Sequence, residues 1–323
     1  MNEKTPLLTI AVPTYNRAAD LDTALAHIAG QIGPFAGEVE VLVSDNCSPD
    51  ATESVVRARM AAGLRVNYIR NAVNIGSDNN FIQCYKKASG KYFWLIGDDD
   101  IILDGAIARI ITILRSGEYG LLHLNSYGFR KDMEAERPPS KGEGHETHTD
   151  LRAFLSRAGY FLTFISANIV NRGVTGADLD FEEFRNTNMI QLCWSFKALF
   201  AGLPNVYVRD YSVAAKSDNS GGYKLCQVFG INFINACELY IRKGADPAYF
   251  EIIKRKLLLR FFPANIIRVR KNILATKPED FFGTLYPLYK GYLYFWLFTV
   301  PAIFLPLWPA FMIFKAADWL RKK

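Results

Sequence analysis

Short apolar runs alternate with helix-like stretches along the first 125 residues of the chain. The runs are rich in residues that favour strands. Alternation of strand and helix is typical of a mainly parallel sheet covered by helices on both faces, with right-handed crossovers. We therefore predict an α/β fold with strands at residues 7–12, 39–44, 66–69, 92–96 and 121–125.

Helices are predicted between these strands. Residues 18–32 carry apolar side chains along one helical face. A second helix is expected after Ser48, which would cap it, with Pro49 at its first position and Asp50 beside the positive end of its dipole. Asp104 is expected to cap another helix. Ligands of parallel sheets bind at the carboxyl ends of the strands, so the loops after the strands should converge on one edge.

The pattern changes after residue 125. Residues 130–150 are polar and lack apolar periodicity, which predicts a mobile loop with no regular element. His145 and His148 lie in it, and we interpret them as solvated surface rather than a metal site. Further along the chain, helices are predicted at 151–164, 187–202, 229–243 and 250–270, the last interrupted at Pro263, and short strands at 165–170 and 206–208.

Three consecutive carboxylates, Asp98, Asp99 and Asp100, follow the strand at 92–96 directly. Like charges at this range repel and raise one another's pKa unless a cation compensates them. Oxygen-only ligands favour Mg²⁺ or Mn²⁺, which typically completes its shell with water and substrate phosphate. The residues predict a divalent-metal site; the alternative is a solvated acidic turn.

Polar residues also end the neighbouring strands. Asp45 closes the strand at 39–44, where a carboxylate can accept hydrogen bonds from a base or a ribose. Asn74, Gly76 and Asn80 offer amide side chains and a glycine that permits close backbone approach. Taken singly, Asp45 is equally typical of a turn and Asn74 of an ordinary helix start.

Several motifs occur in a recognisable order and spacing: AVPTYNR at 11–17, VSDNCSPD at 43–50, NIG at 74–76 followed by Asn80, SGKY at 89–92 and GDDD at 97–100. Together they resemble the family 2 glycosyltransferases with the GT-A fold. The bacterial abequosyltransferase-like branch, which assembles O-antigen and related polysaccharides, looks closest. The resemblance covers about residues 7–125 and, more loosely, the chain to about residue 215.

The resemblance implies roles for individual residues. Asp99 stands in the position of the second Asp of the family's DxD motif and would be the principal metal ligand and a catalytic residue, with Asp98 and Asp100 as further metal ligands. Asp45 would hold the base. The expected nucleotide-sugar contacts are Pro13, Thr14, Tyr15, Asn16, Arg17, Asp45, Asn74, Gly76, Asn80 and Asp98.

The chain departs from the family pattern at two of these motifs. Gly97 stands where the first Asp of the DxD motif is usual, so the division of roles among the three carboxylates is open. Asn79 stands where an Arg often precedes the position of Asn80. A positive contact to the donor diphosphate is therefore missing or supplied from elsewhere.

A third departure concerns the catalytic base. Family members commonly carry an acidic pair about eleven residues before the glycine that ends the helix at 187–202, and this chain has Ile190 and Gln191 there. Neither side chain deprotonates a hydroxyl. Among the nearest carboxylates, which are Asp178, Asp180, Glu182 and Glu183, we favour Glu182 or Glu183. The alternative is that both are acids at a helix start, near the positive end of its dipole.

Composition narrows the class of protein. The 323 residues are 50% apolar and 22% charged, which excludes a disordered, fibrous or polytopic membrane protein. Five cysteines without a CxxC pair, and no signal-peptide pattern at the start, favour a reducing cytoplasm. The net charge of +6 is uneven: residues 251–323 carry 13 Lys and Arg against four acids, a net +9, which leaves −3 for residues 1–250.

The basic tail contains a long uncharged segment. Residues 291–314 are 24 residues without a charge, bounded by Lys290 and Lys315. A straight helix of that length reaches ~36 Å, enough to cross a bilayer, but three prolines argue against straightness. Basic residues on both sides favour a kinked or re-entrant hairpin at the cytoplasmic face of the inner membrane. The aromatics suited to interfacial anchoring are Tyr292, Tyr294, Trp296, Trp308 and Trp319. The alternative is a helical hairpin buried against the catalytic domain.

We therefore expect a GT-A domain at residues 1–215 and a helical region at residues 216–323. The GT-A domain would consist of a nucleotide-sugar half at 1–125, the loop at 130–150 and an acceptor half at 151–215. The helical region would contain a basic amphipathic segment at 250–271. The expected activity is transfer of a sugar from a nucleotide-diphosphate sugar to a hydroxyl of a lipid-linked glycan, with Mg²⁺ or Mn²⁺ and no nucleic-acid partner.

Two alternatives stay open. The first is a non-catalytic, membrane-associated scaffold that binds nucleotide sugars. The second is a nucleotidyltransferase, although the Gly-rich basic loop that it needs after the first strand is absent. A dehydrogenase is excluded because no GxGxxG motif follows that strand.

Overall fold

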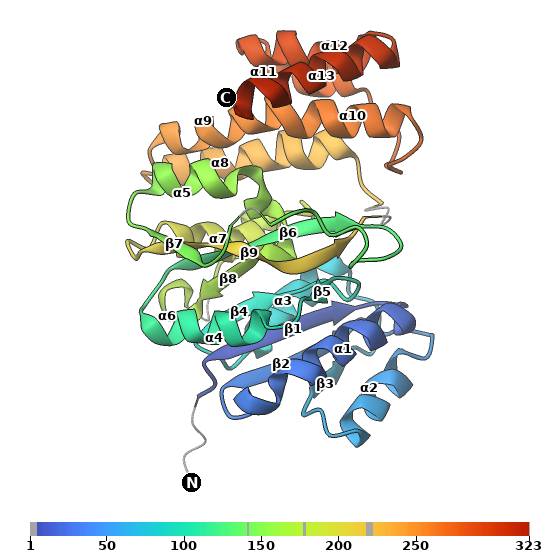
Figure 1. The fold of residues 1–323 in the computed structure, drawn as a ribbon, viewed down its shortest axis with the longest axis vertical. Coiled ribbons are helices and arrows are strands. Elements are labelled where there is room, and N and C mark those ends of the chain that lie inside the picture. Colours follow the sequence, from blue (N-terminus) through green and yellow to red (C-terminus); the bar gives the residue numbers. More distant parts are fainter. Residues whose placement is uncertain (1–4, 141, 177–178, 218–221, 323) are drawn as a thin grey trace. The chain divides into compact units, whose positions relative to one another are not determined.

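The computed structural model describes residues 5–140, 142–176, 179–217 and 222–322, with side chains up to residue 315 (Figure 1). The chain forms two compact units. The first combines Met1–Phe154 with Phe161–Ser217, and the second combines Leu155–Tyr160 with Asp218–Lys323.

Nine strands form one sheet within the described part of the first unit, in the order β3-β2-β1-β4-β8-β6-β9-β5, with β7 paired to β9. The strands β3, β2, β1 and β4 are parallel, as the sequence predicts. β8 then runs antiparallel to both β4 and β6. The bounds are β1 Leu8–Thr14, β2 Val39–Asp45, β3 Asn67–Arg70, β4 Tyr92–Leu95, β5 Ile101–Ile102, β6 Leu121–Phe129, β7 His145–His148, β8 Asn168–Asn171 and β9 Asn205–Lys216.

Helices connect the strands and cover the sheet (Figure 1). α1 spans Ala18–Ile32, as predicted, and buries Leu21, Leu25 and Ile28. The other α-helices of the first unit are α2 Thr52–Ala61, α3 Ser77–Lys87, α4 Ala106–Ser116, α6 Arg172–Thr175 and α7 Gln191–Leu199, and α5 Leu151–Ala158 begins in it. Short 3₁₀ turns lie at Gly33–Phe35, Gly159–Thr163, Ile165–Ala167 and Glu182–Phe184.

Two predicted helix caps are wrong. α2 begins at Thr52 rather than after Ser48, because Ser48 donates its backbone N–H to Asp45 and its hydroxyl accepts from the Asn16 amide. Asp104 does not cap α4, whose N-cap is Gly105 in the left-handed conformation, at φ 76°. Asp50 does sit beside a helix start, since its carboxylate accepts from the backbone N–H of Ala18 in α1.

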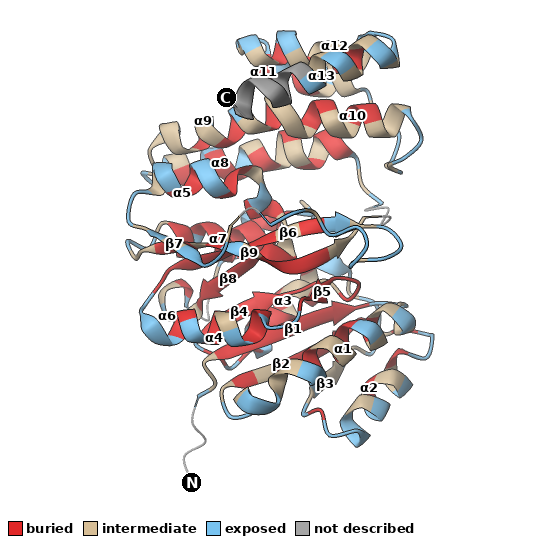
Figure 2. Ribbon diagram, in the orientation of Figure 1, coloured by how far each residue is buried: buried red, intermediate tan, exposed pale blue. Residues whose placement is uncertain are grey.

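The core of the first unit lies between the sheet and its helices. Figure 2 shows the central strands as an almost continuous buried band. β1 and β4 are buried along their whole length, and aliphatic residues of α1 and α4 pack against them. Burial on both faces explains why these strands appear in the sequence as unbroken apolar runs rather than alternating ones.

The prediction that residues 130–150 contain no regular element is wrong. His145–His148 form β7, which pairs antiparallel with β9 through Asn205–Val208. A four-residue edge strand with polar side chains has no apolar face to reveal it. His145 is exposed, as predicted, whereas His148 is half-buried, lies 3.2 Å from Glu146 and packs against Phe154.

The second unit is helical. Pro247–Lys256 (α9) and Phe262–Arg270 (α10) are joined by a π-helical turn at Leu257–Phe261, so the predicted interruption at Pro263 is a wide turn just before the proline. Its remaining elements are the π turns Gln227–Asn232 and Phe295–Thr299 and the helices α8 Phe233–Arg242, α11 Phe281–Tyr289, α12 Val300–Phe304 and α13 Leu307–Lys322.

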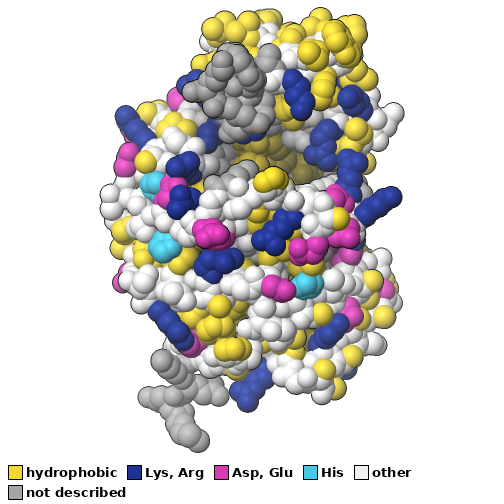
Figure 3. All heavy atoms as spheres, viewed as in Figure 1, with side chains coloured by type: hydrophobic (Ala, Val, Ile, Leu, Met, Phe, Trp, Pro, Cys, Tyr) yellow, Lys and Arg dark blue, Asp and Glu magenta, His cyan; other side chains and the backbone are white. Residues whose placement is uncertain are grey.

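The uncharged segment at 291–314 has two different faces. One packs inside the second unit: Phe295 and Thr299 are fully buried, and the Thr299 hydroxyl donates to the Leu258 carbonyl. The other faces solvent, where Leu293 is 66% and Trp308 74% exposed. Figure 3 shows hydrophobic side chains gathered over α11 and α12. No helix in the described residues is long and apolar enough to cross a membrane.

Gly90 offers a test of the packing between β1 and the start of β4. A Cβ at this position would meet the Thr9 backbone nitrogen at 2.6 Å. We expect Gly90→Ala to destabilise the protein by about 1–3 kcal/mol, because the backbone of β1 cannot yield. Thermal unfolding measures the effect, with Gly30→Ala as control, since nothing lies within 4 Å of a Cβ at Gly30 in α1. An equal melting temperature for Gly90→Ala and wild type would contradict the tight packing.

Candidate functional site

The carboxyl ends of β1, β2 and β4 meet at one edge of the sheet, as predicted. Thr14 and Asp45 are paired residues at the ends of β1 and β2. The Asn46 amide donates to the Thr14 carbonyl over 2.9 Å, and the Ile96 amide donates to the Ala11 carbonyl over 3.0 Å. The loops after these three strands therefore start side by side.

Two of the three consecutive carboxylates share the same cationic partner. Asp98 and Asp99 are only 5% and 6% exposed. The Arg17 Nη1 atom lies 3.0 Å from Asp98 Oδ1 and 2.8 Å from Asp99 Oδ2. The Thr14 hydroxyl donates to Asp98 Oδ2 over 2.7 Å. The last residue of β1 and the turn after it thus supply a neutral and a charged donor to the acidic loop.

The backbone of that turn has a specific shape. Asn16 adopts the left-handed conformation, at φ 56°, which Asn tolerates better than most residues. Its backbone amide is held by Ser48, and the amide of Ala18 is held by Asp50. Tyr15, 45% exposed, projects to solvent at the same edge.

Asp100 has a different environment. Its Oδ2 accepts the Ser166 hydroxyl and its Oδ1 accepts the Lys216 amide over 3.2 Å. Burial, followed by the charge of Asp99, raises its pKa to about 7. These contacts join the acidic loop to the segment before β8 and to the end of β9, so Asp100 serves the structure of the loop, and its role as a metal ligand stays a prediction.

The structure gives a reason for Gly97. A Cβ at this position would stand 3.1 Å from both the Asp99 Oδ1 and the Asp100 Oδ2 atoms. The Gly97 amide also donates to the Ser166 hydroxyl over 2.9 Å. The two carboxylates that follow fold back over the glycine, and a larger side chain would press against them.

Burial disfavours the ionised form of a carboxylate in the acidic loop. It raises the pKa of Asp98 to about 6, although Arg17 and the Thr14 hydroxyl both act to lower it. A carboxylate in this position is ionised at neutral pH because a cation is close. The loop therefore attracts further positive charge.

Asp45 is fully buried, and both of its oxygens have partners inside the protein. The Tyr68 hydroxyl donates to Oδ2 over 2.7 Å, and the Ser48 amide donates to Oδ1 over 2.8 Å. Arg70 lies 3.4 Å from Oδ2. Asp45 is thus satisfied by partners within the protein, and its base-binding role stays a prediction.

The predicted amide residues belong to a hydrogen-bond network that shapes the loop before α3. The Asn80 side chain binds both the hydroxyl and the carbonyl of Ser44. The Asn74 Oδ1 atom accepts from the Asn46 side chain and from the Gly76 amide. Gly76 has φ 82°, which explains the glycine. These side-chain amides connect the end of β2 to the loop before α3 and to α3 itself, a structural role that the sequence alone does not reveal.

The candidate bases lie on the turn Glu182–Phe184, and both Glu182 and Glu183 are exposed. Glu182 accepts from Arg185 over 2.8 Å. The Asp180 carboxylate accepts the Glu182 amide, and Asp178 lies outside the described residues. At the positions of the family's acidic pair, Ile190 and Gln191 are buried, and Gln191 donates to the Thr163 carbonyl.

Arg185 is a cation that the sequence does not single out. Its Nη1 donates to Asn79 Oδ1, where an Arg is usual in the family pattern. Beside it, burial raises the pKa of Asp78, and the nearby backbone amides of residues 186–188 act to lower it. The segment at 182–188 therefore lies against α3, although it is about a hundred residues further along the chain.

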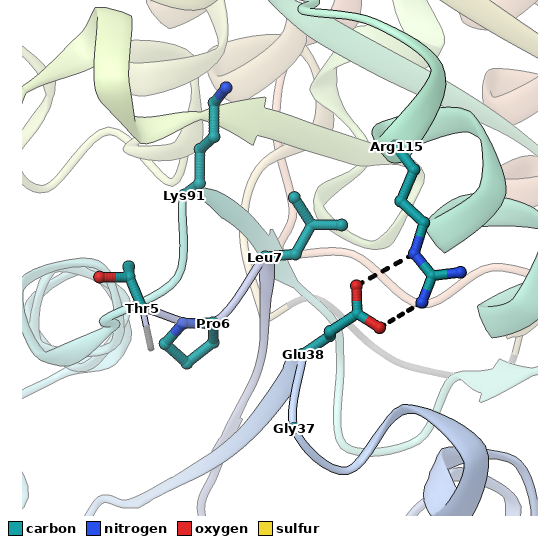
Figure 4. A pocket seen from close by; sticks show the side chains of 7 residues that line it. All are labelled: Thr5, Pro6, Leu7, Gly37, Glu38, Lys91 and Arg115. Atoms are coloured by element: carbon teal, nitrogen blue, oxygen red, sulfur yellow. Dashed lines mark hydrogen bonds and ion pairs between the residues drawn. The ribbon is translucent and has the colours of Figure 1, made fainter. Parts of the chain in front are cut away.

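A separate cavity of about 470 Å³ lies among the residues just before β1, β2 and β4. Thr5, Lys91 and the ion pair between Glu38 and Arg115 line it (Figure 4). These residues precede the strands, whereas the acidic loop follows β4. The cavity is therefore at the opposite edge of the sheet and shares no residue with the predicted site.

Comparison with known families gives the context for this edge. Residues 9–173, just over half of the chain, match Glycosyl transferase family 2. The chain belongs to this family. The match covers β1–β4, the acidic loop and β8, so the edge described above is part of the family 2 region.

Curated relatives cover a shorter stretch. The chain is 36% identical over 111 residues to the abequosyltransferase RfbV of Salmonella typhimurium, which is 34% of this chain and 33% of that protein. It is 32% identical over 120 residues, 37% of each chain, to the GalNAc(5)-diNAcBac-PP-undecaprenol beta-1,3-glucosyltransferase of Campylobacter jejuni. The aligned stretches span about a third of the length of these relatives. Both relatives are named as glycosyltransferases, in agreement with the family 2 resemblance that the sequence motifs predict.

Solved structures share the fold. Staphylococcus aureus TarS 1–349 in complex with UDP superposes with a TM-score of 0.62 at 17% identity, covering 96% of this chain and 87% of that one. A mannosyltransferase from Pyrobaculum calidifontis in complex with GDP-Man and Mn²⁺ gives 0.56 at 16% identity, covering 99% and 89%. The predicted GT-A α/β fold is confirmed.

The divalent-metal site stays a prediction, and only two of its three predicted ligands, Asp98 and Asp99, point to a common position. Asp98 and Asp99 direct one oxygen each to the same nitrogen of Arg17, so their oxygens converge on one point. Mg²⁺ is commonly bound by one or two carboxylates plus substrate phosphates. Among the described residues no group of three metal-ligating side chains comes together. The pair fits an ion that completes its shell with water and donor.

Thr14 tests how the acidic loop is held. We expect Thr14→Val to destabilise the protein by about 1–3 kcal/mol, because buried Asp98 loses a hydroxyl donor. Thr14→Ser keeps the donor and should stay within about 0.5 kcal/mol of wild type. Denaturant unfolding of both variants measures the difference. Equal stabilities of the Val and Ser variants would show that the hydrogen bond does not support the loop.

Proposed function

We propose that this family 2 protein transfers a sugar from a nucleotide-diphosphate sugar to an acceptor hydroxyl. The observation that carries the proposal is the meeting of Thr14 and Arg17 with Asp98 and Asp99 at the carboxyl edge of the sheet. Ligands of such sheets bind at this edge. Structural neighbours are solved with UDP, UDP-GlcNAc and GDP-Man, which supports a nucleotide-sugar donor.

The reaction requires stabilisation of the leaving diphosphate. Asp99, together with Asp98, would hold Mg²⁺ or Mn²⁺, which supplies positive charge to the departing phosphate oxygens. Arg17 and Arg185 add cations of the chain itself, near the end of β1 and the start of α3. Donors placed in advance stabilise developing charge without reorganisation at the moment of reaction. The turn after β1 and the segment at 182–188 would therefore orient the diphosphate.

The acceptor hydroxyl must lose a proton. Glu182 and Glu183 are our candidates for the base, because both are exposed carboxylates on the turn that Arg185 joins to α3. A positioned base contributes typically 10²–10⁴ in rate. Of the two, Glu182 forms an ion pair with Arg185 over 2.8 Å.

For the acceptor, we propose a lipid-linked glycan at the cytoplasmic face of the bacterial inner membrane. One relative is named for a polyprenyl-diphosphate-linked substrate. In the second unit of this chain, exposed Leu293, Trp308 and Phe304 form an apolar surface. Cations border the aromatic rings of the same unit: Lys290 lies over Tyr286 and Lys271 over Phe311. Apolar side chains bordered by Lys and Arg suit an anionic bilayer surface.

A second candidate is a scaffold that binds nucleotide sugars without catalysis. The observation that favours it is the pair Ile190 and Gln191 where family members commonly carry acids. A binder without a base would show nucleotide-sugar affinity but neither transfer nor hydrolysis. Release of nucleoside diphosphate in the presence of Mn²⁺ separates the two functions.

Asp99 tests the catalytic proposal. We expect Asp99→Asn to lower nucleoside diphosphate release at least about 100-fold, because the principal metal ligand loses its charge. The donor is first chosen by thermal shift across a panel of nucleotide sugars, with and without Mn²⁺. Asp104→Asn is the control, since that carboxylate is 92% exposed just beyond the loop. Near-normal, Mn²⁺-dependent turnover of Asp99→Asn would refute the assigned role.

Leu293 and Trp308 test the membrane proposal. Each side chain is worth about 1.5–3 kcal/mol when fully buried in apolar surroundings. We expect the double variant Leu293→Ser, Trp308→Ser to sediment with phosphatidylglycerol-containing vesicles at least about tenfold less than wild type. Val73→Ser, a change at a residue that is 64% exposed in the first unit, should bind as wild type does. A wild-type protein that stays in the supernatant would defeat the proposal.

A further inference from the structure

Arg17 occupies the point at which the two carboxylates of the acidic loop converge. A single atom, Nη1, is 3.0 Å from Asp98 Oδ1 and 2.8 Å from Asp99 Oδ2. Both carboxylates are almost completely buried, whereas the Arg17 side chain is 39% exposed. The Arg17 guanidinium thus lies on the solvent side of two carboxylates that have little contact with water.

A divalent ion and this guanidinium cannot occupy that point together. Mg²⁺ requires its oxygen ligands at 2.0–2.1 Å, and an ion bound to both carboxylates would stand where Nη1 now lies. Two cations at this range also repel each other. Binding of a metal by Asp98 and Asp99 therefore requires Arg17 to leave.

The structure allows Arg17 to leave without disturbing its backbone. The amides of the residues on either side, Asn16 and Ala18, are fixed by Ser48 and Asp50. Arg17 itself is the N-cap of α1, and no hydrogen bond from its side chain caps that helix. Its long side chain can rotate toward solvent while the turn stays in place.

The released guanidinium would face the donor. A metal held by Asp98 and Asp99 brings the donor diphosphate to the same edge of the sheet. Arg presents five N–H donors in a planar fork that matches phosphate oxygens. The same side chain can thus serve the carboxylates in the free protein and the diphosphate in the complex.

We propose that Arg17 is an internal stand-in for the divalent cation, which competes with the metal for Asp98 and Asp99 in the free protein and moves to the donor diphosphate when the metal binds. The inference rests on the metal site of the proposed function. It predicts opposite effects of one substitution: loss of Arg17 strengthens metal binding and weakens donor binding. A residue that only supported the fold would weaken both.

The test measures Mn²⁺ binding to the full-length protein without a donor, by titration calorimetry or by the loss of the free Mn²⁺ paramagnetic resonance signal. We expect Arg17→Met to bind Mn²⁺ at least about fivefold more tightly than wild type. Arg70→Met is the matched control, since Arg70 is 40% exposed and lies 3.4 Å from another buried carboxylate, Asp45, at the same edge. Its Mn²⁺ affinity should equal that of wild type.

A second titration uses the nucleoside diphosphate selected by thermal shift, at saturating Mn²⁺, and we expect Arg17→Met to bind it at least about fivefold more weakly. Should Arg17→Met fail to fold, as judged by circular dichroism, Arg17→Gln carries the same two titrations. Tighter Mn²⁺ binding with weaker nucleotide binding supports the stand-in role.

Unchanged or weaker Mn²⁺ binding by the Arg17 variant, beside a wild type that binds Mn²⁺, overturns the stand-in role and leaves the proposed function standing. Absence of Mn²⁺ binding in wild type and variant alike overturns the metal site itself and, with it, the inference.

Discussion

The first unit is organised around a concentration of negative charge in a place with little water. Asp98, Asp99 and Asp100 follow a fully buried strand and are themselves at most 6% exposed. Such charges persist only where donors and cations surround them. Thr14 comes from the end of β1 and Arg17 from the turn after it, Ser166 from the segment before β8 and the Lys216 amide from the end of β9. The acidic loop therefore depends on β1 and β8 lying on either side of β4.

The three carboxylates have different partners and therefore different roles. Asp100, enclosed by Ser166 and the Lys216 amide, fixes the loop to the sheet. Asp98 and Asp99 instead contact the guanidinium of Arg17, which is 39% exposed and which we propose exchanges with the metal. The absence of a side chain at Gly97 lets Asp99 and Asp100 fold back over it. In the proposed function, Asp100 keeps the loop fixed to the sheet while Asp98 and Asp99 exchange the Arg17 guanidinium for the metal.

The pattern of apolar residues predicted the strands and helices that depend on residues close together in the sequence. β1, β2, β4 and α1 follow from unbroken apolar runs and from one helical stripe, and the rule for parallel sheets then placed Thr14, Asp45 and the acidic loop at one edge. Contacts made across long stretches of chain could not be predicted in this way. β7 is an edge strand without an apolar face. Arg185 donates to Asn79, which is 106 residues earlier in the chain, and the Tyr68 hydroxyl donates to Asp45 from a neighbouring strand. The exposed face of residues 291–314 shows the same limit, because composition cannot tell which apolar residues pack inside.

Anomalous diffraction from a crystal grown with Mn²⁺ and a nucleoside diphosphate would show whether Asp98 and Asp99 form a cation site. We expect an anomalous peak in contact with the Asp99 carboxylate and the diphosphate, with the Arg17 guanidinium moved from its position between Asp98 and Asp99. A bound nucleotide with no peak at Asp99, and with Arg17 still bridging the two carboxylates, would contradict this expectation.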